Sequence, residues 1–205
     1  MATSNAVHFW LRDAAQVMAD HSAELNELDR AIGDGDHGSN MSRGLESALT
    51  IPIDAELLPK DALKQVGMAL VSTVGGASGP LFGTFFLRVG QYWESPPTTD
   101  SIARAVRAGV DAVMSRGKAV EGDKTMVDAL APAAASLEDS ALRQLPLVEA
   151  LALGAQAAAD GAQSTLDMVA RRGRASYLGE RSAGHLDPGA ISSSLILASA
   201  ARHIG

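Results

Sequence analysis

The sequence contains no cysteine, which excludes disulfide bridges, zinc–thiolate sites and a thiol nucleophile. It has no apolar run near the roughly 20 residues that a membrane-spanning helix needs, and its first residues do not resemble a signal peptide. Cations are also scarce, since 17 Lys and Arg stand against 24 Asp and Glu, for a net charge of −7. These deficits predict a soluble, cytoplasmic protein that binds neither nucleic acid nor membrane.

Patterns typical of β-strands are missing as well. Apolar residues recur at steps of three and four along most of the 205 residues, as in amphipathic helices. The expected helices begin near residues 7, 39, 61, 80, 101, 124, 146 and 187, the first continuing to 32 and the seventh to 172. No segment has the composition of an interdomain linker. We therefore expect a single all-α domain over residues 1–205, folded as a helix bundle.

The densest chemical signal lies between the first two expected helices, in residues 28–40. Three carboxylates, Asp29, Asp34 and Asp36, fall within eight positions, and the last two lie among glycines. Carboxylates this close repel one another, and a hard cation such as Mg²⁺, Mn²⁺ or Ca²⁺ relieves that cost through oxygen ligands. The alternative is an Asx-turn with helix caps and no metal.

Two further loops precede expected helices. Glycines in the segment 75–80 leave backbone N–H groups bare at a helix N-terminus, which favours a phosphate site, although a tight turn between helices explains them too. The segment 122–126 does not match a P-loop, and Asp123 could simply cap the helix that follows.

A fourth loop, residues 173–187, is too long for an ordinary connection in a compact domain. Loops of this length usually form a lid or a binding loop. Its residues Arg174 and Arg181 suit an anion, while a solvated basic patch is the alternative. The residues by themselves thus predict an all-α domain that binds a divalent metal and a phosphorylated ligand.

Taken together, the four loops resemble the nucleotide-binding L subunit of dihydroxyacetone kinase and the matching C-terminal domain of the single-chain kinases. The matching segments are LDRxIGDxDHG at 28–38, GGASGP at 75–80, GDKTM at 122–126, GRASYLGERS at 173–182 and DPG at 187–189. The resemblance spans residues 28 to 189 in order. It implies an eight-helix antiparallel barrel with the nucleotide at one end.

The resemblance also implies the site. Asp29, Asp34 and Asp36 would hold two Mg²⁺ ions that bridge to the phosphates of ADP or ATP, and Arg174 would meet the phosphates; these four residues form the expected catalytic set. The remaining residues expected at the nucleotide are His37, Asn40, Met41, Gly76, Ala77, Ser78, Gly79, Leu81, Gly122, Thr125, Met126, Asp187, Pro188 and Gly189.

In such a kinase the acceptor is a short ketose, such as dihydroxyacetone, held covalently by a histidine of a separate K subunit. The chain would then transfer phosphate only together with that partner, with a homodimer as a further possibility. Either ADP stays bound and is rephosphorylated by a phosphotransferase-system protein, which we favour, or ATP exchanges freely. Two alternatives stay open: an erythrulose-type acceptor, and a regulatory module that binds a transcription factor.

Overall fold

The computed structural model describes residues 2–50 and 57–205. Within these residues every regular element is a helix, which confirms the all-α prediction. The α-helices are α1 (Ala2–Asp20), α2 (Ser22–Ile32), α3 (His37–Thr50), α4 (Pro59–Thr73), α5 (Ser78–Gln91), α6 (Thr99–Gly117), α7 (Val127–Leu142), α8 (Leu147–Ser164) and α9 (Pro188–His203). Two 3₁₀ segments, η1 (Thr165–Asp167) and η2 (Arg174–Ser182), lie between α8 and α9. No described helix is both long and apolar enough to cross a membrane.

The first expected helix is divided into α1 and α2 at His21. Helical hydrogen bonds continue across the division, because His21 N donates to Val17 O at 3.0 Å and Leu25 N donates to His21 O at 2.9 Å. The break is therefore a bend in one rod, and counting α1 and α2 together gives the eight expected rods among the described residues.

The expected helix over 146–172 ends earlier than its apolar pattern indicates. Helix α8 stops at Ser164, whose hydroxyl donates to Gly161 O at 2.7 Å, and the Thr165 hydroxyl donates to Ala162 O at 2.6 Å. Hydroxyl groups that bond to the backbone in this way compete with helix continuation. The residues beyond become part of the long connection to α9.

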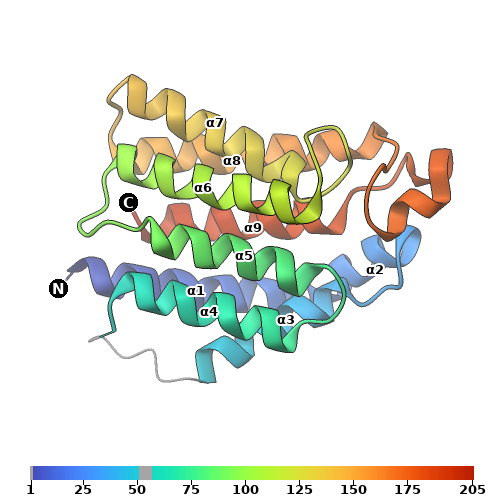
Figure 1. Ribbon diagram of the computed structural model, residues 1–205, viewed down its shortest axis with the longest axis horizontal. Helices are drawn as coiled ribbons and strands as arrows, with labels where there is room; N and C mark the ends of the chain where they lie inside the picture. Colours follow the sequence, from blue (N-terminus) through green and yellow to red (C-terminus); the bar gives the residue numbers. More distant parts are fainter. Residues whose placement is uncertain (1, 51–56) are drawn as a thin grey trace.

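Successive helices run in opposite directions, so alternate connections meet at the same end of the bundle (Figure 1). The connections 33–36, 74–77, 118–126 and 165–187 all lie at the right-hand end in that view, which we call the loop end. Helix α1 begins and α9 ends at the opposite end, here called the terminal end. This topology gathers all four segments with chemical signals in one place.

Small residues let the helices approach closely. A Cβ atom on Gly83 would lie 2.7 Å from Gly67 O, so α4 and α5 meet backbone to backbone. Between α7 and α8, a Cβ atom on Gly161 would overlap Asp128 O. Pro132 has no N–H to donate to that carbonyl four residues earlier, which fits the close approach of α8 there. Glycines at these positions thus permit close helix packing.

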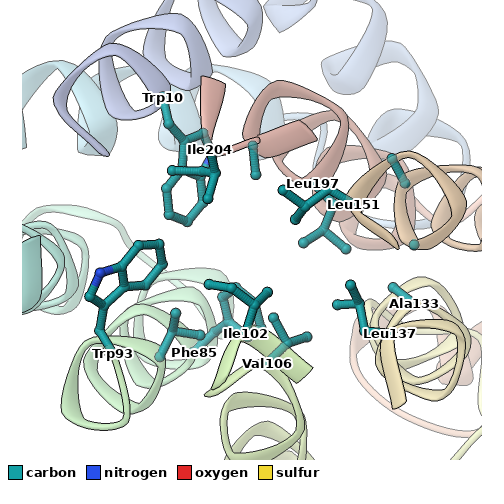
Figure 2. Close-up of a pocket in the computed structure, with 14 residues that line it drawn as sticks. Trp10, Phe85, Trp93, Ile102, Val106, Ala133, Leu137, Leu151, Leu197 and Ile204 are labelled. Carbon is teal, nitrogen blue, oxygen red and sulfur yellow. The ribbon is translucent and has the colours of Figure 1, made fainter. Parts of the chain in front are cut away.

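The terminal end encloses a cavity of about 30 Å³ between α1, α5, α6, α7, α8 and α9 (Figure 2). Its labelled walls are Trp10, Phe85, Trp93, Ile102, Val106, Ala133, Leu137, Leu151, Leu197 and Ile204. The indole nitrogen of Trp10 donates to Ile196 O at 3.1 Å and so joins the first helix to the last. Apolar packing of this kind supplies most of the free energy that stabilises a bundle.

Candidate functional site

A pocket of about 250 Å³ opens at the loop end, where all four connections meet. It receives residues from the end of α2, the starts of α3, α5 and α9, the 118–126 connection and the segment before η2. The expected residues that line it are Asp29, Asp34, Asp36, His37, Asn40, Gly76, Ala77, Ser78, Leu81, Thr125, Met126, Arg174, Asp187, Pro188 and Gly189.

Asp29 organises the connection between α2 and α3. Its Oδ2 atom accepts hydrogen bonds from the backbone N–H groups of Gly35 and Asp36, both at 2.9 Å, and of His37 at 3.2 Å. Gly33 lies against the other oxygen, Oδ1, so closely that a Cβ atom there would overlap it. The connection is therefore folded around one carboxylate. These hydrogen bonds are the structural role that the Asx-turn alternative describes.

The same connection brings three carboxylates together. One oxygen from each of Asp29, Asp34 and Asp36 lies within 4.8 Å of the others. Asp29 uses Oδ2 to accept from three amides, Asp34 and Asp36 are exposed to solvent, and all three residues line the pocket. An oxygen-only donor set with this spacing fits a hard divalent cation such as Mg²⁺.

Arg174, the first residue of η2, contacts this carboxylate cluster. Its Nη2 lies 3.0 Å from Asp34 Oδ2, and the side chains are 62% and 43% exposed, respectively. An exposed pair of this kind contributes little to stability, so the guanidinium can leave the carboxylate at small cost. The pair places the expected phosphate-binding cation directly beside the expected metal ligands.

His37 connects three helices beneath the pocket. Its side chain is only 6% exposed, with Nδ1 at 3.2 Å from Ser78 Oγ and Nε2 at 2.9 Å from Ser192 Oγ. The Ser192 hydroxyl donates to Gly189 O at 3.1 Å, so we assign the hydrogen on His37 to Nε2 and an acceptor role to Nδ1. With this assignment Ser78 donates to His37, His37 donates to Ser192, and Ser192 donates to the carbonyl of Gly189.

The electrostatic surroundings agree with a neutral imidazole. Burial lowers the pKa of His37, and the nearby carboxylates of Asp29 and Asp36 only partly oppose that shift. A neutral ring with both nitrogens hydrogen-bonded serves as a fixed strut, which argues against a metal-ligand role for His37.

The start of α5 leaves its first amides without a side-chain cap. Ala77 makes no capping hydrogen bond, and Gly76 has φ +66° with open space around its Cα. Uncapped N–H groups and the positive end of the helix dipole attract an anion. Gly79 has a different role, because a Cβ atom there would overlap Val74 O; it lets α5 begin directly against the end of α4.

The long connection before α9 is more ordered than its sequence indicates. Residues 168–187, which we call the lid, contain the 3₁₀ segment η2, with a break at Gly179 where φ is +57°. Ser182 Oγ donates to Gly179 O at 2.6 Å and accepts from Ala170 N at 2.8 Å. A small apolar cluster separate from the main core, formed by Ile32, Ala170, Ala175 and Leu178, holds the lid against α2.

Two aspartates fix the connection 118–126 by accepting hydrogen bonds from its backbone. Asp123 accepts from Val120 N at 3.0 Å and does not cap α7. Asp128, in the first turn of α7, accepts from Gly122 N at 2.5 Å and Thr125 N at 2.7 Å, and so fixes the connection against the start of the helix. Helix α7 itself begins without a side-chain cap, although an acidic residue in its first turn favours the helix dipole.

The start of α9 agrees with the sequence. Asp187 caps the helix, with its Oδ2 accepting from Ala190 N at 2.7 Å, and Pro188 is the first helical residue. Burial raises the pKa of Asp187 to about 7, with the carboxylates of Asp128 and Asp29 adding to the shift. The Ala190 amide and Lys124 oppose it. A carboxyl group that titrates near neutrality thus lies on the pocket wall.

Three expected residues do not line the pocket. Met41 is fully buried in the main core, Gly79 packs against the end of α4, and Gly122 is not part of the pocket wall. Eight residues that we did not single out do line it: Ile32, Gly33, Gly75, Phe82, Lys124, Arg172, Gly173 and Ala175. Six of these are themselves positions of the matching motifs and Arg172 directly precedes one, which was the available signal. Phe82 instead belongs to an apolar helical stripe, which pointed to the core.

Comparisons with known proteins agree on one family. The model of the DAK2 domain matches residues 31–202. The chain is 47% identical over 186 residues to the PEP-dependent dihydroxyacetone kinase, ADP-binding subunit DhaL, of Escherichia coli, covering 89% of each chain. It is also 38% identical to L-erythrulose 1-kinase of Mycolicibacterium smegmatis, covering 92% of this chain and 34% of that enzyme.

Solved structures give the same result for the fold. The dihydroxyacetone kinase of C. freundii superposes with a TM-score of 0.74 at 26% identity, over 98% of this chain and 35% of that one. Its complex with AMP-PNP and Mg²⁺ gives a TM-score of 0.71 at 27% identity, over 98% of this chain and 33% of the other. The chain therefore spans about a third of that kinase. On the family match and the E. coli relative together, this protein belongs to the DAK2 domain family.

Proposed function

We propose that this chain is the ADP-binding subunit of a dihydroxyacetone kinase and passes phosphate from a bound nucleotide to a ketose held by a separate subunit. The observation that carries the proposal is the group of three carboxylates at the mouth of a loop-end pocket that also holds an uncapped helix start and an arginine. The name of the 47% identical E. coli relative supports the same assignment.

Asp29, Asp34 and Asp36 are the residues that would hold Mg²⁺, and we propose two ions. When bound, the metal would neutralise charge on the nucleotide phosphates, which phosphoryl transfer requires together with accurate positioning. Asp29 is fixed for this purpose by three backbone amides. Its orientation is thereby set before any ion arrives.

The other pocket residues would position the nucleotide. The free amides at the start of α5 suit a phosphate oxygen, and the Ser78 side chain there is held by His37. Arg174 would exchange its ion pair with Asp34 for one with a phosphate, because the metal and the arginine compete for the same carboxylate. Asp187, Pro188 and Gly189 would close the remaining wall beside the lid.

We further propose that ADP remains bound and is rephosphorylated by a phosphotransferase-system protein. PEP-dependent relatives at 47% and 43% identity support this variant over free exchange of ATP. Erythrulose kinases among the relatives keep a second acceptor open, since the acceptor would be held by the K subunit and not by this chain.

One experiment tests the central proposal. The purified protein is denatured, and the released small molecules are identified by mass spectrometry and counted against protein. About one ADP per chain supports a retained cofactor, while an empty protein that binds ATP reversibly with Mg²⁺ supports the exchanging variant. A protein that carries no nucleotide and binds none with Mg²⁺ would refute the assignment.

The acceptor is tested by reconstitution. The chain is mixed with a candidate K subunit and a phosphate source, and dihydroxyacetone or erythrulose is offered. We expect phosphorylated ketose only when both subunits are present. Turnover of dihydroxyacetone by this chain alone would contradict the division of labour between subunits.

A further inference from the structure

Lys124 is the least exposed charged residue described in this protein, with 1% of its surface accessible. It lies in the connection 118–126 with φ +62°, an unusual backbone conformation for lysine. A buried ammonium is costly unless its hydrogens are bonded, so its partners indicate why it is there. The expected nucleotide contacts do not include this residue.

The ammonium group of Lys124 joins two points that are distant in the sequence. Nζ donates to Thr165 O at 2.6 Å, just before the lid, and to His185 O near the end of the lid. It therefore bonds to both chain segments at the base of the lid, one where the lid leaves the bundle and one where it returns. Two of its three hydrogens are used in this way, which leaves the group poorly placed to serve as a free phosphate ligand.

Other hydrogen bonds at the base of the lid join the same two segments, but their donors are neutral. Gly184 N donates to Leu166 O at 2.7 Å, and Asp187 N donates to Thr165 Oγ1 at 3.0 Å. Hydrogen bonds from a charged donor are roughly twice as strong as neutral ones. The lysine thus makes the strongest connection across the base of the lid.

Burial and nearby acidic groups act on the ammonium in opposite directions. Desolvation is the larger effect and lowers the pKa of Lys124, while Asp187, Asp167 and Asp128 favour the charged form. Asp123, the residue before it, accepts the Arg171 amide through its carbonyl at 3.0 Å. The connection 118–126 therefore forms hydrogen bonds with both ends of the lid.

We propose that Lys124 is a positioning residue that clamps the base of the lid and so slows release of the nucleotide. It acts through Arg174, which the closed lid holds beside the metal-binding carboxylates. The inference rests on the proposed function for its nucleotide readout, but not for the closure of the lid itself.

The first test replaces the ammonium with an uncharged side chain of similar length, Lys124→Met. We expect ADP to dissociate at least tenfold faster in stopped-flow measurements. We also expect trypsin to cleave sooner after the lid arginines, Arg171, Arg172, Arg174 and Arg181, as mapped by mass spectrometry. Unchanged rates for both readouts in folded K124M would overturn the proposal.

A matched control separates a loose lid from general loss of stability. Leu137→Ala enlarges the cavity at the terminal end, far from the lid, and is expected to lower thermal stability. At a temperature well below both unfolding transitions, L137A should release ADP and resist trypsin as the parent protein does. Equal acceleration in L137A and K124M would mean that instability alone opens the lid, and would overturn the clamp.

The absence of cysteine permits a chemical rescue. Lys124→Cys carries a single thiol, which bromoethylamine converts in the unfolded chain into a thioether analogue of lysine. After refolding, the aminoethylated protein should regain slow ADP release and trypsin resistance, while K124C alkylated with a neutral reagent should not. Recovery with the neutral reagent, or no recovery by an aminoethylated protein of parental stability, would overturn the role of the charge.

The two readouts also distinguish the ways in which the idea can fail. If the parent protein binds no nucleotide, the proposed function fails, whereas the trypsin comparison still tests the clamp. If the parent protein binds ADP and K124M changes neither readout, the clamp alone fails.

Discussion

The two ends of this bundle differ in polarity: one is packed with apolar side chains, and the other carries charged residues. The terminal end is an apolar core with tryptophans stacked at 6.5 Å and a cavity of only about 30 Å³. The loop end has a pocket of about 250 Å³, three carboxylates within 4.8 Å and a buried lysine. Close carboxylates and a buried charge lower the stability of the loop end. Apolar packing at the terminal end offsets that loss of folding stability.

The largest effect is expected at the terminal end. Trp10→Ala removes a buried indole and its hydrogen bond to Ile196 O, which should lower the free energy of unfolding by about 3–5 kcal/mol. ADP affinity, measured by calorimetry on the folded protein, should change little. A strong loss of affinity with intact fold would show that the two ends are not separable.

The second prediction reverses that comparison at the loop end. Asp34→Asn removes one carboxylate of the cluster and should weaken Mg²⁺-dependent ADP binding about 100-fold, or about 2.7 kcal/mol. Stability should hold, because Asp34 is exposed and its pair with Arg174 contributes little. Asp139→Asn, which removes another exposed aspartate paired with an arginine, here Arg143, is the control and should leave affinity unchanged. Unfolding of D34N at unchanged affinity would instead favour a purely structural loop.

The third prediction concerns pH. The folded pKa of Asp187, about 7, lies above its ordinary value of 3.8, so the folded state retains this proton to higher pH than the unfolded state. Stability should therefore fall as pH rises from about 4 to about 7, by roughly 1–3 kcal/mol. Asp187→Asn stays neutral and can still cap α9, so its stability should lack that fall. Urea titrations of both proteins without nucleotide at pH 5 and pH 8 make the comparison.

A carboxyl group at the opposite end titrates in the other direction. Burial of Asp13 opposes ionisation, but hydrogen bonds from Ser199 and Arg202, with the charges of Arg202 and His203, hold the pKa of Asp13 below its usual value. Its contribution is lost as pH falls, not as it rises, so it does not mimic the Asp187 effect. An identical pH response in D187N and the parent protein would contradict the third prediction.

The smallest effect tests how tightly the terminal end is packed. Gly154→Ala adds a methyl group beside the cavity, 3.2 Å from Leu137 Cγ, where that side chain has room to shift. Since alanine also favours the helix, we expect a gain of about 0.5–1 kcal/mol in unfolding free energy. A loss would mean that Leu137 cannot move into the cavity.

Helix periodicity and capping residues were sufficient to predict the fold class and most helix starts. Asp187 and Pro188 are an example, because a cap followed by proline is a local signal that the structure reproduces. The bend at His21 was not predictable, since Met18 before it and Leu25 after it are seven residues apart and stay on one apolar stripe. The early end of α8 at Ser164 depends on hydroxyl bonds to the backbone, which a hydrophobic pattern does not report.

The site was harder to predict where contacts are distant in sequence. The acidic cluster was visible because its members lie within eight residues. The link from His37 to Ser192 joins residues 155 positions apart, and the bonds of Lys124 reach 41 and 61 positions away. No local pattern in the sequence reports such pairs.

The hydrogen bond from Trp10 to Ile196 O has a consequence for how the protein folds. It spans 186 residues and closes the bundle by placing α1 beside α9. Contacts this distant form slowly, because a long loop must close before they stabilise anything. During synthesis, the Trp10 face of α1 stays uncovered until α9 has been made. Exposed apolar surface of this kind favours aggregation, so α1 is a segment that benefits from protection in the growing chain.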